Sequence, residues 1–169
     1  GQSHPDFDND LAEYVEITRN EIRKDYSKFK DVVDQETMNK IVEDKVIERV
    51  HQAMQSVVFN LNTMHSRSGS QVVFSGINIG MCKNKDAELV CKAFLEEFEK
   101  GMGRGEVLIF PNVAFAVKKG LNYPGDPQHY LLRLACRVAS KKMNPTFLNM
   151  DSKITGPYTE EGIRIAIMG

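Results

Sequence analysis

The feature that most constrains the fold is a stretch without glycine or proline from Val32 to Ser68. Within it, apolar residues recur at three- and four-residue steps, the spacing typical of one face of an α-helix. This stripe consists of Val42, Val46, Val50, Ala53, Val57, Leu61 and Met64. Asp34 stands near the start of this stretch and is a favourable N-cap for the helix. A helix over about residues 35–64 is roughly 45 Å long at 1.5 Å per residue, which is long for a small globule, so we expect a partner.

A second amphipathic pattern precedes this helix. Apolar residues from Phe7 to Phe29 recur at the same spacing, and Pro5 suits the first turn of a helix. The residues before Pro5 are assigned to no element. Two long helices joined by the segment KDVVDQ predict an antiparallel hairpin as a first unit, over residues 1–66.

After Gly69 the pattern changes to alternating strands and helices. Strands are predicted in GSQVVFSGINIG, in EVLIFPNVAFAV, a region that Pro111 breaks, and in TFLNMD. Helices are predicted at residues 85–100 and after Pro127, the latter ending at Pro145. Ile163, Ile165 and Ile167 alternate with other side chains, which predicts a further strand. Residues 67–169 thus read as β-α-β-α-β crossover units of an α/β sheet or barrel.

Composition excludes several classes of function. The chain is 41% hydrophobic and 27% charged with a net charge of -1, which argues against binding of DNA or a membrane surface through bulk charge. No apolar run is long enough to span a bilayer. The three cysteines form no CxxC pair, which favours a reducing compartment and a cytoplasmic location.

Short motifs give little sign of catalysis. GMGRG lacks the context of a phosphate-binding loop and is interpreted as a helix end. Cys91 and Cys136 lie on apolar helix faces and are predicted to be buried and inert, whereas Cys82 follows a strand and is predicted to be exposed. The histidines are scattered and no metal-ligand spacing is present. We therefore predict no catalytic residue and no metal ligand in this chain.

The most unusual stretch is NLNTMHSRSGSQ, which joins the long helix to the first of these strands. Its polar side chains either satisfy the last carbonyls of the helix or form a loop that leads into an active-site strand, with Arg67 available to a phosphate. Asn78 either reaches into a barrel or faces solvent. Spacing alone leaves both alternatives open.

Three long segments, in order, resemble the anaerobic (class III) ribonucleoside-triphosphate reductases, which are glycyl-radical enzymes. They are NLNTMHSRSGSQVVFSGINIG, the segment from GRGEVLIFP through KKMNPTF, and the closing IMG. Within them the chain departs from the family pattern at Val73, where proline is usual, and at Gly76, where serine or threonine is usual.

The resemblance implies a fold and an activity. The fold would be part of the family's ten-stranded α/β barrel, with residues 67–169 as a partial barrel half. The activity of the parent enzyme would be reduction of ribonucleoside triphosphates by radical chemistry, with formate as reductant and a radical-SAM activase as partner. In the family a cysteine follows the segment like AIMG and becomes the thiyl radical. We therefore expect this chain to be inactive alone and to carry no cofactor itself, although the parent family uses a glycyl radical, a zinc ion held by four cysteines, and ATP or dNTP effectors.

The resemblance also suggests binding residues. The predicted substrate-binding residues are Ser66, Arg67, Ser68, Gln71, Ser75 and Asn78. The helical hairpin is the predicted homodimer surface and effector site, and the lysines expected to meet effector phosphates are Lys24, Lys28, Lys40 and Lys45. Expected partners are nucleoside triphosphates, a second copy, the activase and the remaining parts of a reductase.

Two alternatives remain open at this point. The chain could be a truncated paralogue that serves as a non-catalytic nucleotide-binding or dimerisation module. It could also derive from another glycyl-radical enzyme, such as a relative of the formate lyases, although HSRSGSQ and NPTF favour the reductases.

Overall fold

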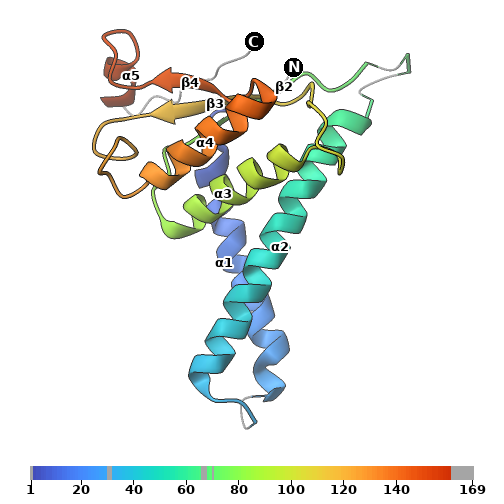
Figure 1. Ribbon diagram of the computed structural model, residues 1–169. Helices are drawn as coiled ribbons and strands as arrows, with labels where there is room; N and C mark the ends of the chain where they lie inside the picture. Colours follow the sequence, from blue (N-terminus) through green and yellow to red (C-terminus); the bar gives the residue numbers. More distant parts are fainter. Residues whose placement is uncertain (1, 30–31, 66–67, 70, 161–169) are drawn as a thin grey trace.

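The computed structural model describes residues 2–29, 32–65, 68–69 and 71–160, and is shown in Figure 1. Its centre is a four-stranded parallel sheet with strand order β1-β2-β3-β4. The strands are β1 (Gln2–His4), β2 (Ser75–Ile79), β3 (Asn112–Val117) and β4 (Thr146–Asn149). The predicted crossover pattern is confirmed for β2, β3 and β4, whereas the strand predicted at residues 163–167 lies outside the described residues.

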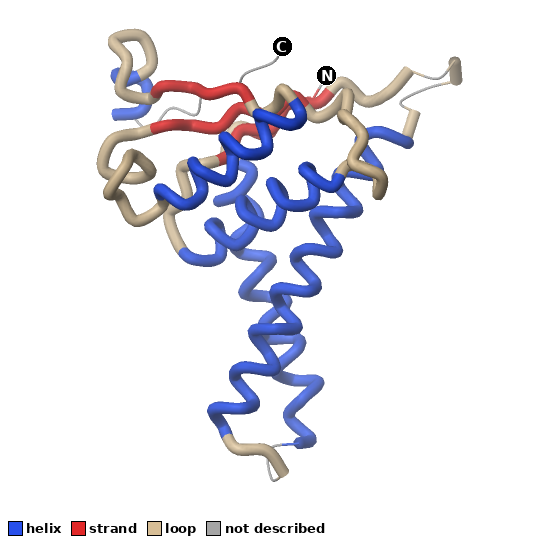
Figure 2. Tube along the Cα trace, in the orientation of Figure 1, coloured by secondary structure: helices blue, strands red, loops and turns tan. Residues whose placement is uncertain are grey.

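The connection between β1 and β2 is the predicted pair of long helices. They are α1 (Phe7–Tyr26), a short 3-10 turn η1 (Ser27–Phe29), and α2 (Gln35–Thr63). Asp34 caps α2, as predicted, because its Oδ1 accepts a hydrogen bond of 2.9 Å from the Thr37 N–H. The hairpin projects away from the sheet, with its turn at the far end of the molecule (Figures 1 and 2).

Two further helices cross between the later strands. They are α3 (Lys85–Lys100) and α4 (His129–Lys142), and both lie on the same face of the sheet (Figure 1). The N-cap of α3 is Asn84, and its C-terminal cap is Gly101 with φ 68°, so GMGRG is the end of a helix, as predicted. A last short helix is α5 (Gly156–Glu160).

One hydrophobic core joins the hairpin to the sheet. It lies between the helices and the face of the sheet formed by Ile77, Val113 and Phe115. Phe94 and Phe98 of α3 are fully buried there, and α3 packs against α1, α2 and α4. The opposite face of the sheet is not part of this core, and residues on it line a pocket.

Three expectations from the sequence were wrong. The residues before Pro5 form strand β1, because Gln2–His4 pairs with Ser75, Gly76 and Ile77. Cys82 is buried rather than exposed, because it folds against Asp8 of α1. Cys136 is exposed rather than buried, because the covered face of α4 is the one that carries Leu134, Ala135 and Val138.

None of the helices that the structure describes is long and apolar enough to cross a membrane.

Candidate functional site

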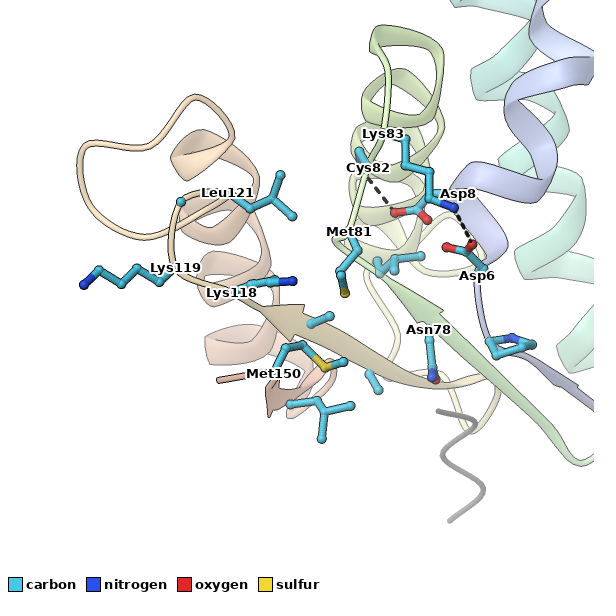
Figure 3. A pocket seen from close by; sticks show the side chains of 16 residues that line it. Asp6, Asp8, Asn78, Met81, Cys82, Lys83, Lys118, Lys119, Leu121 and Met150 are labelled. Atoms are coloured by element: carbon cyan, nitrogen blue, oxygen red, sulfur yellow. Dashed lines mark hydrogen bonds and ion pairs between the residues drawn. The ribbon is translucent and has the colours of Figure 1, made fainter. Parts of the chain in front are cut away.

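A pocket with a volume of about 600 Å³ lies where the carboxyl ends of the four parallel strands meet. Its lining follows each strand in turn: Pro5 and Asp6 after β1, Met81 and Cys82 after β2, Lys118 and Lys119 after β3, and Met150 after β4. Ligands of parallel α/β sheets bind at this edge, and the volume is typical of a small-molecule site. Figure 3 shows these side chains around the pocket.

The floor of the pocket is the sheet face opposite the hydrophobic core. Asn78 of β2 stands beside Ala114 of β3, and Ala116 stands beside Leu148 of β4. Side chains of register partners in a parallel pair lie on the same face. Because Ala114 and Ala116 are small, space remains above β3, and the Asn78 amide stands at the edge of that space.

Gly80 holds the rim of the pocket in place. Its N–H donates to Asp8 Oδ2 at 2.8 Å, and its carbonyl accepts from Asn122 Nδ2 at 3.0 Å. Asn122 is fully buried, donates also to the Ala116 carbonyl, and accepts from the Lys118 N–H. This network fixes the segment after β3 against the segment after β2.

Asn9 fixes the other side of the rim. Its Oδ1 accepts from the Lys83 N–H at 2.8 Å, and its Nδ2 donates to the Met81 carbonyl at 2.9 Å. The start of α1 therefore holds the segment Gly80–Lys83 through Asp8 and Asn9, although about seventy residues separate them along the chain.

Three lysines belong to the segments that surround the pocket. Lys118 is partly buried and extends across the pocket, whereas the neighbouring Lys119 is exposed and points away from it (Figure 3). Lys83 Nζ lies 3.5 Å from Asp6 Oδ2. Lys118 is thus the cation best placed to meet an anionic group inside the pocket.

A buried carboxyl and two buried thiols lie at the side of the pocket. The Cys82 thiol donates to Asp8 Oδ2 at 3.3 Å. Burial raises the pKa of Asp8 to about 6, against hydrogen bonds from Gly80 and Cys82 that lower it. The hydrogen bond with Cys91, and then burial, raise the pKa of Cys82. The same hydrogen bond lowers the pKa of Cys91, but burial together with the Asp8 and Glu88 carboxylates raises it overall. Without a metal ion these thiols stay protonated at neutral pH.

The structure separates the residues predicted to bind substrate. Asn78 lines the pocket, whereas Ser75 on the same strand is buried on the opposite face. Ser68 and Gln71 are exposed and precede the amino end of β2, away from the pocket edge of the sheet. Ser66 and Arg67 lie outside the described residues. Apart from Asn78, the structure brings none of the described members of this set to the pocket, and their roles stay predictions.

The lysines predicted to bind an effector are all exposed on the hairpin. Lys24 is in the last turn of α1, Lys28 is in η1, and Lys40 and Lys45 are in α2. Lys45 pairs with Glu48 at 2.7 Å. Their predicted role is likewise a prediction only.

Sequence reasoning missed most of the pocket. Neither Asp8 nor Lys118 was predicted to belong to a binding site. A usable signal was present for Lys118, because it follows a predicted strand, and the ends of parallel strands meet at one edge. Without β1, however, the position of Asp8 beside that edge could not be inferred.

Comparison with known proteins decides the family. The sequence model of the anaerobic ribonucleoside-triphosphate reductases matches residues 1–169. The chain belongs to this family. It is 30% identical to the anaerobic ribonucleoside-triphosphate reductase of Escherichia coli K12 and 32% identical to that of Haemophilus influenzae, with 90% of this chain and 21% of each relative covered. It is 29% identical to the reductase of that name from Enterobacteria phage T4, over 100% of this chain and 27% of the relative. The chain thus spans about a fifth to a quarter of the length of these curated relatives.

The zinc implied by the family resemblance does not fit the residues present. A site of four cysteines needs one more cysteine than the three in this sequence, and Cys136 is exposed on α4 while Cys82 and Cys91 lie together near the pocket. No step is therefore assigned to that zinc site in this chain.

Proposed function

We propose that this chain is a section of the catalytic subunit of an anaerobic ribonucleoside-triphosphate reductase, acting in the cytoplasm. The observation that carries the proposal is the family match over residues 1–169, together with a parallel sheet whose pocket lies at the strand ends. The radical chemistry would be supplied by groups that the family resemblance assigns to other parts of the enzyme. This section would bind and orient the nucleotide and would be inactive alone.

The sheet would form part of the ten-stranded barrel of the family, with its uncovered face toward the lumen. Two features support this arrangement. The helices that pack on the sheet lie on one face, as on the outside of a barrel (Figure 2). The opposite face carries the alanines and Asn78 that line the pocket. The lumen wall would then be formed by residues with short side chains, which leave room for a nucleotide.

The substrate of the pocket would be a ribonucleoside triphosphate. Lys118 would pair with a phosphate, because it is a partly buried cation that extends into the pocket. Asn78 would orient a polar group of the ribose or base, because an amide both donates and accepts hydrogen bonds. The network of Gly80 and Asn122 would keep the rim rigid, so that little entropy is lost when the nucleotide binds.

The direct test is to capture the native protein from anaerobically grown source cells with an antibody against this chain. We expect an intact mass several times 19.1 kDa. The captured protein should reduce ribonucleoside triphosphates after treatment with a radical-SAM activase and formate. A native mass near 19.1 kDa without that activity would contradict the proposal.

The hairpin would be the dimer surface and would carry the effector site. Apolar side chains project from it into solvent, with Tyr14 63%, Ile17 52% and Ile47 41% exposed. Such residues on a projecting helix pair are typical of a surface that a second copy covers. The lysines named above would meet effector phosphates near the same surface.

Sedimentation equilibrium tests this surface. The chain should have twice its monomer mass, and Ile17→Glu should shift it to monomer. The control is Ile109→Glu, which changes a side chain that is 71% exposed outside the hairpin and should leave the dimer intact. A dimer that is equally stable in both variants would place the interface elsewhere.

The alternative function is a non-catalytic module that binds nucleotides and pairs with an intact reductase subunit. The same pocket and hairpin would serve it. It becomes the better account if the native protein has the mass of this chain alone and still binds nucleotides.

A further inference from the structure

Asp8, Cys82 and Cys91 bring three potential metal ligands together at the side of the pocket. They come from α1, from the segment after β2, and from α3. One oxygen and two sulfur atoms all lie within 4.8 Å of one another. The three residues are 1%, 3% and 0% exposed. The proposed function assigns no role to the two thiols.

We propose that this cluster binds one zinc ion through the Asp8 carboxylate and the thiolates of Cys82 and Cys91. Thiolate sulfur and carboxylate oxygen are ordinary ligands of Zn²⁺, and two thiolates favour it over Mg²⁺ or Ca²⁺. In a tetrahedral site with Zn–S near 2.3 Å and Zn–O near 2.0 Å, the ligand atoms are about 3.5–3.8 Å apart. A cluster whose members already lie within 4.8 Å needs only small side-chain rotations to reach that geometry.

Neighbouring groups already hold the ligands in place. The Asp8 carboxylate accepts from the Asn9 N–H at 2.9 Å on one oxygen and from the Gly80 N–H at 2.8 Å on the other. The Gln128 side chain donates to the Cys82 carbonyl at 2.8 Å. Partners of this kind orient metal ligands and are normally found around metal sites.

The fourth position would be open to the pocket. Asp8 and Cys82 both line the pocket, which gives an ion and a water molecule a path to the cluster. Gln128 is 7% exposed, and its Oε1 has no hydrogen-bond donor within the part of the chain that the structure describes. A water on the metal would supply such a donor beside Cys82. Three protein ligands and one exchangeable water is an established zinc arrangement.

Two other interpretations of the cluster predict different experimental results. It could be a metal-free joint held by the hydrogen bond from Cys82 to Asp8. Alternatively, Cys82 and Cys91 could form a disulfide when an oxidant removes their two protons and two electrons. The metal account requires both thiols to be reduced and to lose their protons to the buffer on binding.

The test uses the whole chain, purified without oxygen, stripped with a chelator and titrated with Co²⁺. We expect one Co²⁺ per chain, with the ultraviolet charge-transfer absorption of cobalt thiolates, and stoichiometric displacement by Zn²⁺. Absence of that absorption in the wild-type chain would overturn the proposal. So would a mass two hydrogens below the reduced value, which would indicate the disulfide instead.

Two cysteine variants make a matched pair. Cys91→Ser removes a ligand, so Zn²⁺ affinity measured against a chromophoric chelator should fall more than about 100-fold, beyond the 10–100-fold typical for loss of a supporting group. Cys136→Ser changes the exposed thiol on α4 and should alter affinity less than twofold. Equal affinities in the two variants would overturn the proposal.

The change of Tm on addition of Zn²⁺ tests the proposal even in variants of low stability. Zn²⁺ should raise the Tm of the wild-type chain and of Cys136→Ser, because an ion that binds only the folded state stabilises it. It should not raise the Tm of Asp8→Asn, which keeps the size of the side chain but removes the anionic ligand. A Zn²⁺-dependent rise in Asp8→Asn equal to that of wild type would contradict the assignment.

Discussion

Gly80 is the residue on which the geometry of the pocket most depends. It has φ 103°, in a region that side chains rarely adopt, and a Cβ there would lie 3.0 Å from the Ala116 carbonyl oxygen and from the ring of Phe115. Both of its backbone polar groups are held, one by Asp8 and the other by Asn122. A substitution at Gly80 therefore disturbs α1, β2 and β3 together.

We predict that Gly80→Ala lowers the free energy of unfolding by about 1–3 kcal/mol beyond the loss in a matched control, because the new methyl group meets backbone and a buried ring. The control is Gly103→Ala, since Gly103 has φ 109° but no atom within 4 Å of an added Cβ. Urea denaturation measures both. Equal losses would mean that backbone conformation, and not the close approach, makes glycine necessary at Gly80.

At the scale of residues, the sequence predicted what depends on near neighbours. Asp34 was identified as an N-cap because its partner, Thr37, lies three residues away. Cys82 was misplaced because its burial depends on Asp8, which lies 74 residues earlier. The spacing of residues around Cys82 does not indicate a contact with a residue so far away in the sequence. Such a contact can be predicted only when the fold is known.

At the scale of elements, the long periodic segments were predictable and the short ones were not. The boundaries of α3 were predicted as residues 85–100 and are Lys85–Lys100. Strand β1 was missed, because three residues carry no readable period and its pairing with β2 spans the whole hairpin. The pairing of β1 with β2 places β1 at one end of the sheet. The side of the pocket that follows β1 could therefore not be predicted from the sequence.

The contact between α3 and α4 should depend on pH. Glu99 of α3 accepts from Lys141 at 2.6 Å and from Arg137 at 2.7 Å, and these cations lower the pKa of its carboxyl. A carboxylate whose pKa is lower in the folded state stabilises the fold above its unfolded pKa. That contribution is lost as pH falls through the folded value.

We therefore predict that Glu99→Gln lowers the free energy of unfolding at pH 7 by roughly 0.5–1 kcal/mol, the range for partly exposed ion pairs. The difference should shrink as the pH falls through the lowered pKa of Glu99, because the wild-type carboxyl then becomes protonated and loses its charge. Urea denaturation at pH 7 and at a series of more acidic pH values measures it, with Glu13→Gln on the exposed side of α1 as control. A difference that stays constant over the whole series would attribute the effect to packing.

At the scale of the whole molecule, helices cover one face of the parallel sheet and leave the other face uncovered in the part of the chain that the structure describes. The opposite face and the strand ends form the pocket, and the long hairpin projects from the covered side (Figures 1 and 2). The family resemblance implied such an α/β arrangement, and the described residues confirm its parallel crossover part. The barrel itself is a proposal, because the described sheet has four strands and the family resemblance implies ten.

The central claim is that the pocket at the strand ends binds a ribonucleoside triphosphate through Lys118. Calorimetric titration of the chain with CTP tests it most directly, using Lys118→Ala and the adjacent Lys119→Ala, whose side chain points away from the pocket (Figure 3). We predict one saturable site whose Kd rises about tenfold in Lys118→Ala, a loss of about 1.4 kcal/mol, and changes less than twofold in Lys119→Ala. No binding by the wild-type chain, or equal weakening in both variants, would contradict the claim.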